Sequence, residues 1–164
     1  MKKYLGIISD THISNGAKLH PKIYNLFKEA DGIIHAGDLT DMKVLKELEM
    51  IASVWAVYGN MDAHTIRQEL PEKRIVEWEG KRIGIIHRSK SPDRENPEGI
   101  LPLFSNDNID CLIFGHSHKP CNKIISRILC FNPGSPSGQY GQTPSVGCLY
   151  IEGSLLVGKI TSIT

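Results

Sequence analysis

The sequence predicts an α/β (α+β) fold in which two β-sheets pack face to face as a sandwich and helices flank them on the outside. Short apolar runs rich in Ile and Val, bounded by Gly or Asp, recur along the chain and are typical of strands buried on both faces. Amphipathic helical periodicity separates the first three of these runs. After about residue 70 the pattern changes to hairpins, which predicts a second sheet.

The first half of the chain alternates predicted strands with predicted helices, as βαβ units do. We expect strands at residues 4–9, 32–36 and 53–58. Apolar residues at the i, i+3, i+4, i+7 spacing of an amphipathic helix separate the first two strands: Ile23, Leu26, Phe27 and Ala30. The same spacing recurs between the second and third strands: Leu45, Leu48 and Ile51. Asp41 precedes this second stretch and is placed to act as its N-cap, and the sheet is expected to be mainly parallel.

The second half is expected to consist mainly of hairpins. The stretch "RIVEWEGKRIGIIH" predicts two strands joined by a tight turn at Glu79 and Gly80. A buried strand is expected at 111–115, and the tail carries the β-rich runs "KIISRILCFN" and "SVGCLYIEGSLLVGKI". Residues 88–99 form the one long polar loop, and loops of that length are often functional or mobile. Without an internal repeat or a low-complexity segment, residues 1–164 are expected to form one domain.

The composition is that of an ordinary soluble globular protein. Of the 164 residues, 40% are hydrophobic and 23% are charged, and the formal net charge is +1. Basic residues are scattered among acidic ones, which argues against binding to a nucleic-acid duplex, and no apolar run approaches the roughly 20 residues of a membrane helix. The cysteines include no CxxC pair and are expected to be free thiols: Cys111, Cys121, Cys130 and Cys148. We expect a cytoplasmic protein, and homo-oligomer formation stays open.

Each of the five buried strands ends in side chains that commonly bind metals. In open α/β sheets, ligands bind outside the carboxyl ends of the strands, and residues one position apart in extended chain project to the same side. Taken singly, a Gly-Asp turn or a His-x-His pair has an ordinary structural explanation, as a helix cap or a hydrogen-bonded surface pair. Five such strand ends together favour convergence on one site. The converging residues are Asp10, His12, Asp38, Asn60, His87, His116 and His118.

The chemistry of this set predicts two divalent metal ions and an anionic substrate. Nitrogen and oxygen ligands without a thiolate suit Mn²⁺, Fe, Ni²⁺, Co²⁺ or Zn²⁺ better than Ca²⁺. Seven side chains exceed what one metal needs while leaving room for water, and two ions about 3.5 to 4 Å apart need a bridging anion such as an aspartate. Four positive charges against two aspartates leave a site that attracts a phosphate ester and a hydroxide.

The motifs "DTH", "GDL", "GNMD", "GIIH" and "GHSH", in that order over the whole chain, resemble those of the calcineurin-like metallophosphoesterases. The stretch "FNPGSPS" is similar to the Asn-Pro-Gly-Ser turn of the small single-domain bacterial and archaeal phosphodiesterases of that family. The resemblance implies a β-sandwich flanked by helices and a two-metal centre, for which manganese is the first expectation. It further implies that Asp10, His12 and His118 hold one metal. Asn60, His87 and His116 would hold the other, and Asp38 would bridge the two.

Two positions depart from the pattern of the family. Met61 stands where many relatives carry a histidine that supports the leaving group, whereas Asp62 keeps the acid that would orient the metal ligands or a water. Arg88 stands where relatives commonly have glycine, and either grips a phosphate as a fork of donors or is an exposed loop arginine. Lys90 and Arg94 of the same loop are expected to be solvated.

These observations predict a metal-dependent phosphodiesterase that acts by in-line attack of a hydroxide bridging the metals. Asp62, Asn60 and His87 are expected to act in catalysis, and Asn60 and Arg88 in substrate binding. The alternatives are a weak phosphomonoesterase, a structural metalloprotein, and a non-catalytic protein-binding scaffold such as the retromer subunit that resembles this family. The branch of that subunit has lost ligands in the last histidine block, whereas this chain keeps both. His35 is expected to form hydrogen bonds in the core or behind the ligands.

Overall fold

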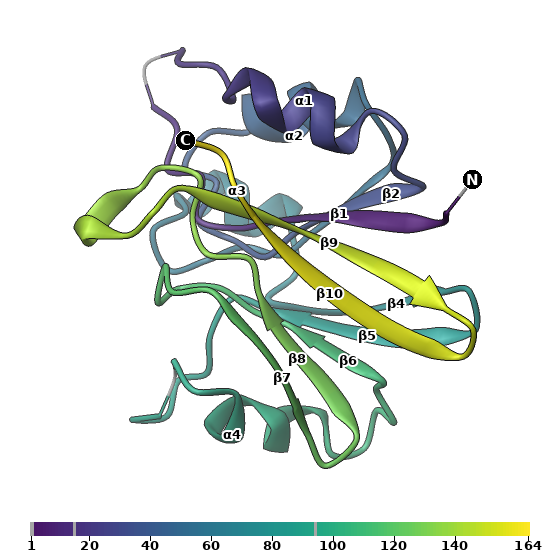
Figure 1. The fold of residues 1–164 in the computed structure, drawn as a ribbon. Coiled ribbons are helices and arrows are strands. Elements are labelled where there is room, and N and C mark those ends of the chain that lie inside the picture. The colour runs from purple at the N-terminus through teal and green to yellow at the C-terminus, as the bar shows by residue number, and fades with distance from the viewer. Residues whose placement is uncertain (1, 15, 94) are drawn as a thin grey trace.

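The computed structural model describes residues 2–14, 16–93 and 95–164, and these residues form two five-stranded sheets packed face to face (Figure 1). The first sheet has the order β10-β9-β1-β2-β3: β1 (Tyr4–Ile8), β2 (Gly32–His35), β3 (Val54–Ala56), β9 (Ser145–Glu152) and β10 (Leu155–Ser162). The second sheet has the order β4-β5-β6-β8-β7: β4 (Lys73–Trp78), β5 (Lys81–Ile86), β6 (Cys111–Ile113), β7 (Cys121–Ile125) and β8 (Ile128–Asn132).

Helices cover the outer faces of both sheets, which confirms the predicted sandwich with helices outside. In Figure 1, α1 (Pro21–Phe27) and α2 (Lys43–Glu49) lie above the first sheet, and α4 (Pro97–Ile100) lies below the second. The helix α3 (His64–Glu69) follows β3, and short 3₁₀ turns occupy Leu101–Phe104 and Gln139–Gly141. Among the helices in the described ranges, none has the length and hydropathy needed to span a membrane.

Parallel pairing places the ends of the central strands at one edge of each sheet. β1, β2 and β3 pair in parallel in the first sheet, and β5, β6 and β8 do so in the second. The other pairings are antiparallel, so both sheets are mixed and the expectation of a mainly parallel sheet holds only for β1 to β3 and for β5, β6 and β8. The loops that follow the parallel strands therefore gather on one side of the molecule.

The apolar runs form strands because both faces of each central strand are covered. All side chains of Leu5–Ile8 are buried, with a helix on one face and the opposite sheet on the other. The helix α1 buries Ile23 and Phe27 against β1, and a Cβ at Gly6 would lie 2.8 Å from the Phe27 ring. The absence of a side chain at Gly6 thus lets the helix pack closely on the strand.

Between the sheets, Phe131 of β8 fills the space that two glycines leave. Its side chain is fully buried, and a Cβ at Gly147 or Gly158 would overlap its ring. Gly147 and Gly158 lie on β9 and β10, so Phe131 joins the second sheet to the antiparallel part of the first. It belongs to the core cluster that also holds Leu5 and Ile113.

Two local predictions needed correction. Met42, not Asp41, occupies the N-cap position of α2. Asp41 lies one residue before this position, and its side chain still accepts a hydrogen bond from the Lys43 amide at 2.9 Å. The predicted polar loop ends early, since α4 begins at Pro97. The predicted strands are confirmed with bounds that differ by at most two residues at either end, and all four cysteines are free thiols.

The contact between the sheets predicts a large stability loss for Phe131→Ala. Removing a fully buried aromatic ring leaves a cavity, so the free energy of unfolding should fall by about 3 to 5 kcal/mol in urea denaturation. Ile124→Ala is the control, because this side chain is 71% exposed and its removal should change stability by less than about 0.5 kcal/mol. Equal losses for the two variants would contradict the packing role of Phe131.

Candidate metal centre

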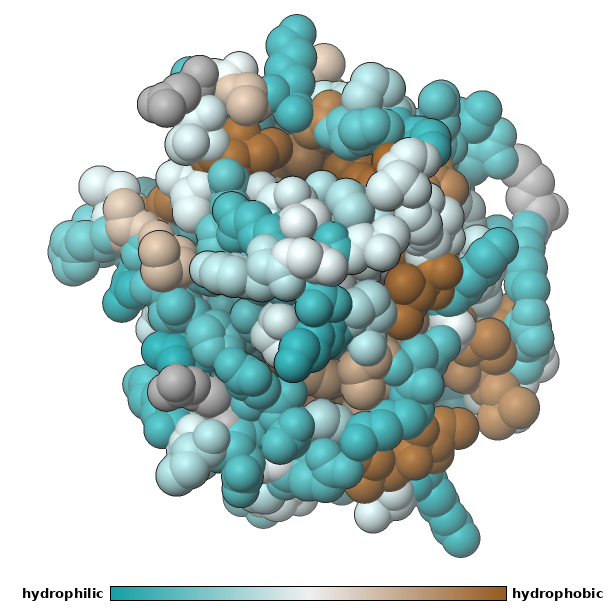
Figure 2. Space-filling view, turned by 60° about the vertical axis from the view of Figure 1, so that its left-hand side comes forward, coloured by the Kyte–Doolittle hydropathy of each residue, from teal (hydrophilic) through white to brown (hydrophobic). Residues whose placement is uncertain are grey.

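Six of the seven predicted ligands lie in two clusters of three at the ends of the parallel strands. The first cluster consists of Asp10, His12 and His118, and the second of Asp38, His87 and His116. Within each cluster, one potential ligand atom per residue lies within 4.8 Å of the others. The side of the molecule where these strands end, toward the left of Figure 1, presents mainly hydrophilic residues, with hydrophobic residues in separate patches (Figure 2).

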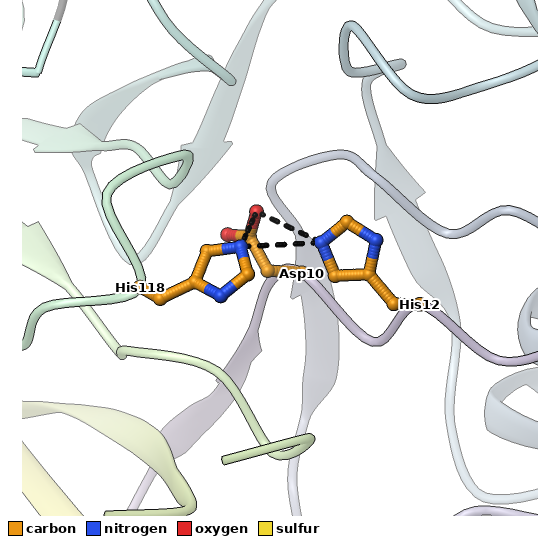
Figure 3. Close-up of side chains that lie close together, drawn as sticks. All are labelled: Asp10, His12 and His118. Carbon is orange, nitrogen blue, oxygen red and sulfur yellow. Dashed lines mark hydrogen bonds and ion pairs between the residues drawn. The ribbon is translucent and has the colours of Figure 1, made fainter. Parts of the chain in front are cut away.

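In the first cluster, two imidazole nitrogens and a carboxylate oxygen point at one another (Figure 3). His118 Nε2 lies 3.2 Å from Asp10 Oδ1 and 3.2 Å from His12 Nε2. His12 Nε2 lies 3.6 Å from the same carboxylate oxygen. Three lone-pair-bearing atoms at these separations repel one another unless a proton or a cation lies between them.

The second cluster repeats this arrangement, with Asn60 beside it. His87 Nδ1 lies 2.7 Å from the Ala36 carbonyl, which only accepts, so Nδ1 carries the donated hydrogen. The other ring nitrogen, Nε2, faces Asp38 Oδ2 at 3.2 Å and Asn60 Oδ1 at 3.1 Å. Two oxygens and a nitrogen thus surround one position, and Asn60 joins the cluster as the seventh predicted residue.

One carboxylate oxygen of Asp38 faces both clusters. Asp38 Oδ2 lies 3.2 Å from His87 Nε2 and 3.8 Å from His12 Nε2. The other oxygen, Oδ1, accepts a hydrogen bond from the Met61 amide at 2.8 Å, which fixes the orientation of the carboxylate. The geometry therefore suits an aspartate that reaches two cations at once.

Asp10 presents a buried oxygen without a partner. Its Oδ2 accepts hydrogen bonds from Ser9 Oγ at 2.6 Å and from the His116 amide at 3.0 Å. Among the described residues, Asp10 Oδ1 and His118 Nδ1 are the buried side-chain polar atoms that lack a hydrogen-bond partner. Burial acts to raise the pKa of Asp10, but the adjacent His118 and His12 rings, the charge of His87 and the hydrogen bond from Ser9 hold it well below its usual range. A buried ionised oxygen of this kind fits a cation.

His87 Nε2 and Asp38 Oδ2 lie 3.2 Å apart, and the two residues shift each other's pKa. Burial acts to lower the pKa of His87, but the hydrogen bond with Asp38 and the charges of Asp10 and Asp38 raise it above its usual value. Burial acts to raise the pKa of Asp38, but His87 and the Met61 amide lower it. A divalent cation would take the place of the proton that this pair shares.

Five of the cluster residues adopt the left-handed backbone conformation. The φ angles are 54° at Asp10, 46° at His12, 56° at Asp38, 73° at His116 and 58° at His118. Such conformations cost about 1 to 3 kcal/mol each in non-glycine residues and persist only where surrounding structure enforces them. The backbone turns sharply at these five residues, so their side chains lie close to the ends of the strands that precede them.

Glycines at two of the turns allow the strand ends to approach closely. A Cβ at Gly59 would overlap the Asp38 carboxylate. A Cβ at Gly115 would overlap Ser9 Oγ and would lie 2.6 Å from Asp10 Oδ2. No other residue type fits at these positions without displacing a candidate ligand.

Asp62 braces two of these turns through the backbone. Its carboxylate accepts hydrogen bonds from the amides of Gly59 at 2.7 Å, Asp38 at 3.0 Å and Thr40 at 2.7 Å. The side chain is buried, and each of these partners is a backbone amide. Asp62 therefore fixes the loops that carry Asp38 and Asn60.

The "FNPGSPS" stretch braces the other side of the centre, a role that the sequence analysis did not assign. Asn132 Nδ2 donates to the Gly115 carbonyl at 3.0 Å, and its Oδ1 accepts from the Gly134 amide at 2.9 Å. Ser135 Oγ donates to the Asp10 carbonyl at 2.7 Å. The short polar side chains of this Pro-Gly turn are the sequence signal from which such bracing could have been inferred.

Further contacts beside the proposed centre, made by Arg67 and Glu95, were not predicted from the sequence. Arg67 donates from Nε to the Asp62 carbonyl at 2.8 Å and from Nη2 to the Asn60 carbonyl at 2.6 Å. Glu95, from the 88–99 loop, places Oε1 3.7 Å from His116 Nε2. A carboxylate in a polar surface loop carries no sequence signal for such a contact.

The remaining predicted residues lie around the centre. Met61 is 61% exposed, and Arg88 is half-buried beside Asn60 and His87. Lys90 is exposed as expected, whereas Arg94 lies outside the described residues.

His35 forms hydrogen bonds in the core behind the ligands, as predicted. Its Nε2 lies 3.2 Å from Thr11 Oγ1, and its Nδ1 accepts from the Gly37 amide at 3.1 Å. Burial of this ring lowers the pKa of His35 to about 3, so the side chain is neutral.

Comparison with known proteins agrees with this geometry. The sequence matches the model of the calcineurin-like phosphoesterase superfamily domain over residues 4–154. A probable metallophosphoesterase from Methanothermobacter thermautotrophicus is 39% identical over 157 residues, which cover 95% of this chain and 90% of the relative. A phosphodiesterase from Methanocaldococcus jannaschii is 28% identical over 163 residues, which cover 90% of this chain and 93% of the relative. Vps29 from Chaetomium thermophilum, at 22% identity and a TM-score of 0.83 over 99% of this chain and 86% of that one, shows the fold alone.

The tight approach at Gly115 predicts that Gly115→Ala loses metal binding. The added Cβ displaces Ser9 or Asp10, so binding of Mn²⁺ measured by calorimetry should weaken by at least about tenfold. Gly80→Ala is the control, because a Cβ there meets no atom within 4 Å although the φ of +73° costs about 1 kcal/mol. Unchanged Mn²⁺ affinity in Gly115→Ala would contradict this role.

The neutral state of His35 predicts a pH-dependent stability. The unfolded chain protonates a histidine near its ordinary pKa of about 6.5, whereas folded His35 stays neutral down to about 3. Because the unfolded state binds more protons in this window, the free energy of unfolding falls as the pH falls. Relative to His35→Gln, the wild-type value should fall more steeply between about pH 6 and pH 4, by up to about 1.4 kcal/mol per pH unit.

Urea denaturation of the metal-free proteins across this range provides the measurement. His64→Gln is the control, since His64 is exposed at the start of α3 and should leave the slope unchanged. Parallel pH curves for the wild type and His35→Gln would show that His35 is not buried as a neutral ring.

Proposed function

The chain belongs to the calcineurin-like phosphoesterase superfamily, and we propose that it is a metal-dependent phosphodiesterase that hydrolyses phosphate diesters by in-line attack of hydroxide. The observation that carries the proposal is the convergence of nitrogen and oxygen ligand atoms from five strand ends on two adjacent positions, with a buried carboxylate oxygen of Asp10 left without a hydrogen-bond partner among the described residues. Two divalent cations, when bound there, supply the hydroxide and offset the charge that develops on phosphorus oxygens.

We assign the ligands by the two clusters. Asp10, His12 and His118 would hold one cation, and Asn60, His87 and His116 would hold the other. Asp38 would contribute to both sites, because its Oδ2 faces a histidine of each cluster. Manganese is the first expectation, and Ni, Fe, Co and Zn suit the same donors.

The residues beside the ligands bind and orient rather than attack. Asn60 is placed to contact the phosphate as well as a cation, and Arg88 is a donor for an anionic group of the substrate. Asp62 acts as a positioning residue, because its carboxylate binds the amides of the loops that carry the ligands.

Position 61 favours diesters over monoesters. The Met61 side chain is exposed at the rim and has no proton to donate to a leaving oxygen, so substrates with a stable leaving group and a single phosphate charge are preferred. The similarity to an archaeal phosphodiesterase supports the same choice. Retention of both His116 and His118, one in each cluster, favours catalysis over a scaffold role.

Metal analysis combined with a diesterase assay tests the proposal. Mn²⁺-loaded wild type should bind about two metals and hydrolyse bis(p-nitrophenyl) phosphate near neutral pH. Asp38→Asn and His116→Ala should each lose bound metal and at least about 100-fold in rate, because each removes a direct ligand. The control is Asp41→Asn, the same chemical change at a side chain that contacts the Lys43 amide. Variants that keep both metals and full turnover would refute the assignment.

A further inference from the structure

A cavity of about 230 Å³ lies beside the proposed metal centre. Asn60 and His87, two of the proposed ligands, form part of its wall. The cavity is smaller than the roughly 300 to 1,000 Å³ typical of a site for a whole ligand, so it fits one group attached to the reacting phosphate.

Positive charge dominates the lining of this cavity. Three cationic side chains and one carboxylate contribute to the wall: Arg67, Arg88, Lys90 and Glu72. Lys90 and Glu72 form an ion pair at 3.0 Å at the exposed rim and offset each other. The charges of the two arginines are left without a carboxylate partner in the cavity.

The positive charge of Arg67 is not offset by a carboxylate, because its contacts among the described residues are with neutral groups. It donates to the backbone carbonyls of Asp62 and Asn60, and its guanidinium lies 5.5 Å from the centroid of the Tyr58 ring. Neither contact neutralises the guanidinium. The contacts instead hold it rigidly at the wall of the cavity.

Arg88 is the side chain most available to a ligand. It is half-buried, and its guanidinium has no hydrogen bond or ion pair among the residues that the structure describes. It also lies near the centre, because it lines the same cavity as Asn60 and His87, two of the proposed ligands. A partly desolvated guanidinium without a partner is well suited to bind an anion through two parallel hydrogen bonds.

We propose that this cavity binds a second anionic group of the substrate, so that the preferred diesters carry a negative charge beyond the scissile phosphate. The proposal rests on the phosphodiesterase function proposed above and names its substrate class: phosphodiesters with a phosphorylated or otherwise anionic arm. Arg88 is the specificity-determining residue, with Arg67 contributing charge. The scissile phosphate itself lies at the metal centre, outside this cavity.

A matched pair of esters tests the proposal. The p-nitrophenyl ester of thymidine 5′-phosphate and the same ester carrying a 3′-phosphate differ only in the distal anionic group. With Mn²⁺-loaded protein at fixed ionic strength, KM for the 3′-phosphorylated ester should be about tenfold lower, on the scale of one charge-assisted hydrogen bond. Arg88→Gln should remove this preference. Calorimetric titration with thymidine 3′,5′-bisphosphate and thymidine 5′-monophosphate should give the same ratio in Kd.

Arg127→Gln is the control with the same loss of charge. Arg127 lies in the turn between β7 and β8, at the end of these strands opposite to the metal centre, and should keep the preference. If Arg88→Gln weakens both esters equally, Arg88 binds the scissile phosphate and the inference is overturned. Absence of a preference in the wild type overturns it as well, while hydrolysis of both esters still supports the phosphodiesterase. Failure to hydrolyse any diester overturns the proposed function, and the calorimetric ratio still decides whether the cavity binds an anion.

Discussion

Mutual repulsion among buried lone pairs is the constraint on which the rest of this structure depends. Nitrogen and oxygen atoms from separate strand ends lie within about 3 to 4 Å of one another, and a carboxylate oxygen among them has no hydrogen-bond partner in the described part of the chain. Such a cluster is unfavourable in itself. The surrounding fold must hold these atoms together, and the bracing by Asp62 and Asn132 shows how it does so through backbone groups rather than through contacts with the ligand atoms.

The strained turns and the glycines beside them follow from the same constraint. Residues in the left-handed conformation turn the chain sharply just after a buried strand. Gly59 lets its turn approach Asp38, and Gly115 lets its turn approach Ser9 and Asp10. Each feature costs free energy locally, and packing between the sheets offsets it. The loops that carry the proposed ligands are therefore positioned by hydrogen bonds that need no cation, which lowers the ordering cost of binding.

The sequence alone located the seven candidate ligands because each follows a buried strand, and parallel strands bring their carboxyl ends to a shared edge. It did not reveal the left-handed turns, since those depend on tertiary contacts that no local pattern encodes. The roles of Ser135 and Arg67 were missed for a related reason. Both side chains donate to backbone carbonyls, and because every residue has one, the sequence does not show which carbonyl a side chain will bind. The Asp41 cap was misplaced by one residue because boundary positions depend on local geometry.

The bracing of the Asp10 carbonyl by Ser135, together with the pairing of β1 with β9, has a consequence for biosynthesis. The strand β1 completes its hydrogen bonding only with β9, a segment that is made much later than β1 itself. Contacts of such long sequence separation form slowly, so the cation pocket takes shape only after Ser135 and β9 have been synthesised. A nascent chain would therefore carry the histidines without yet being able to sequester a metal ion.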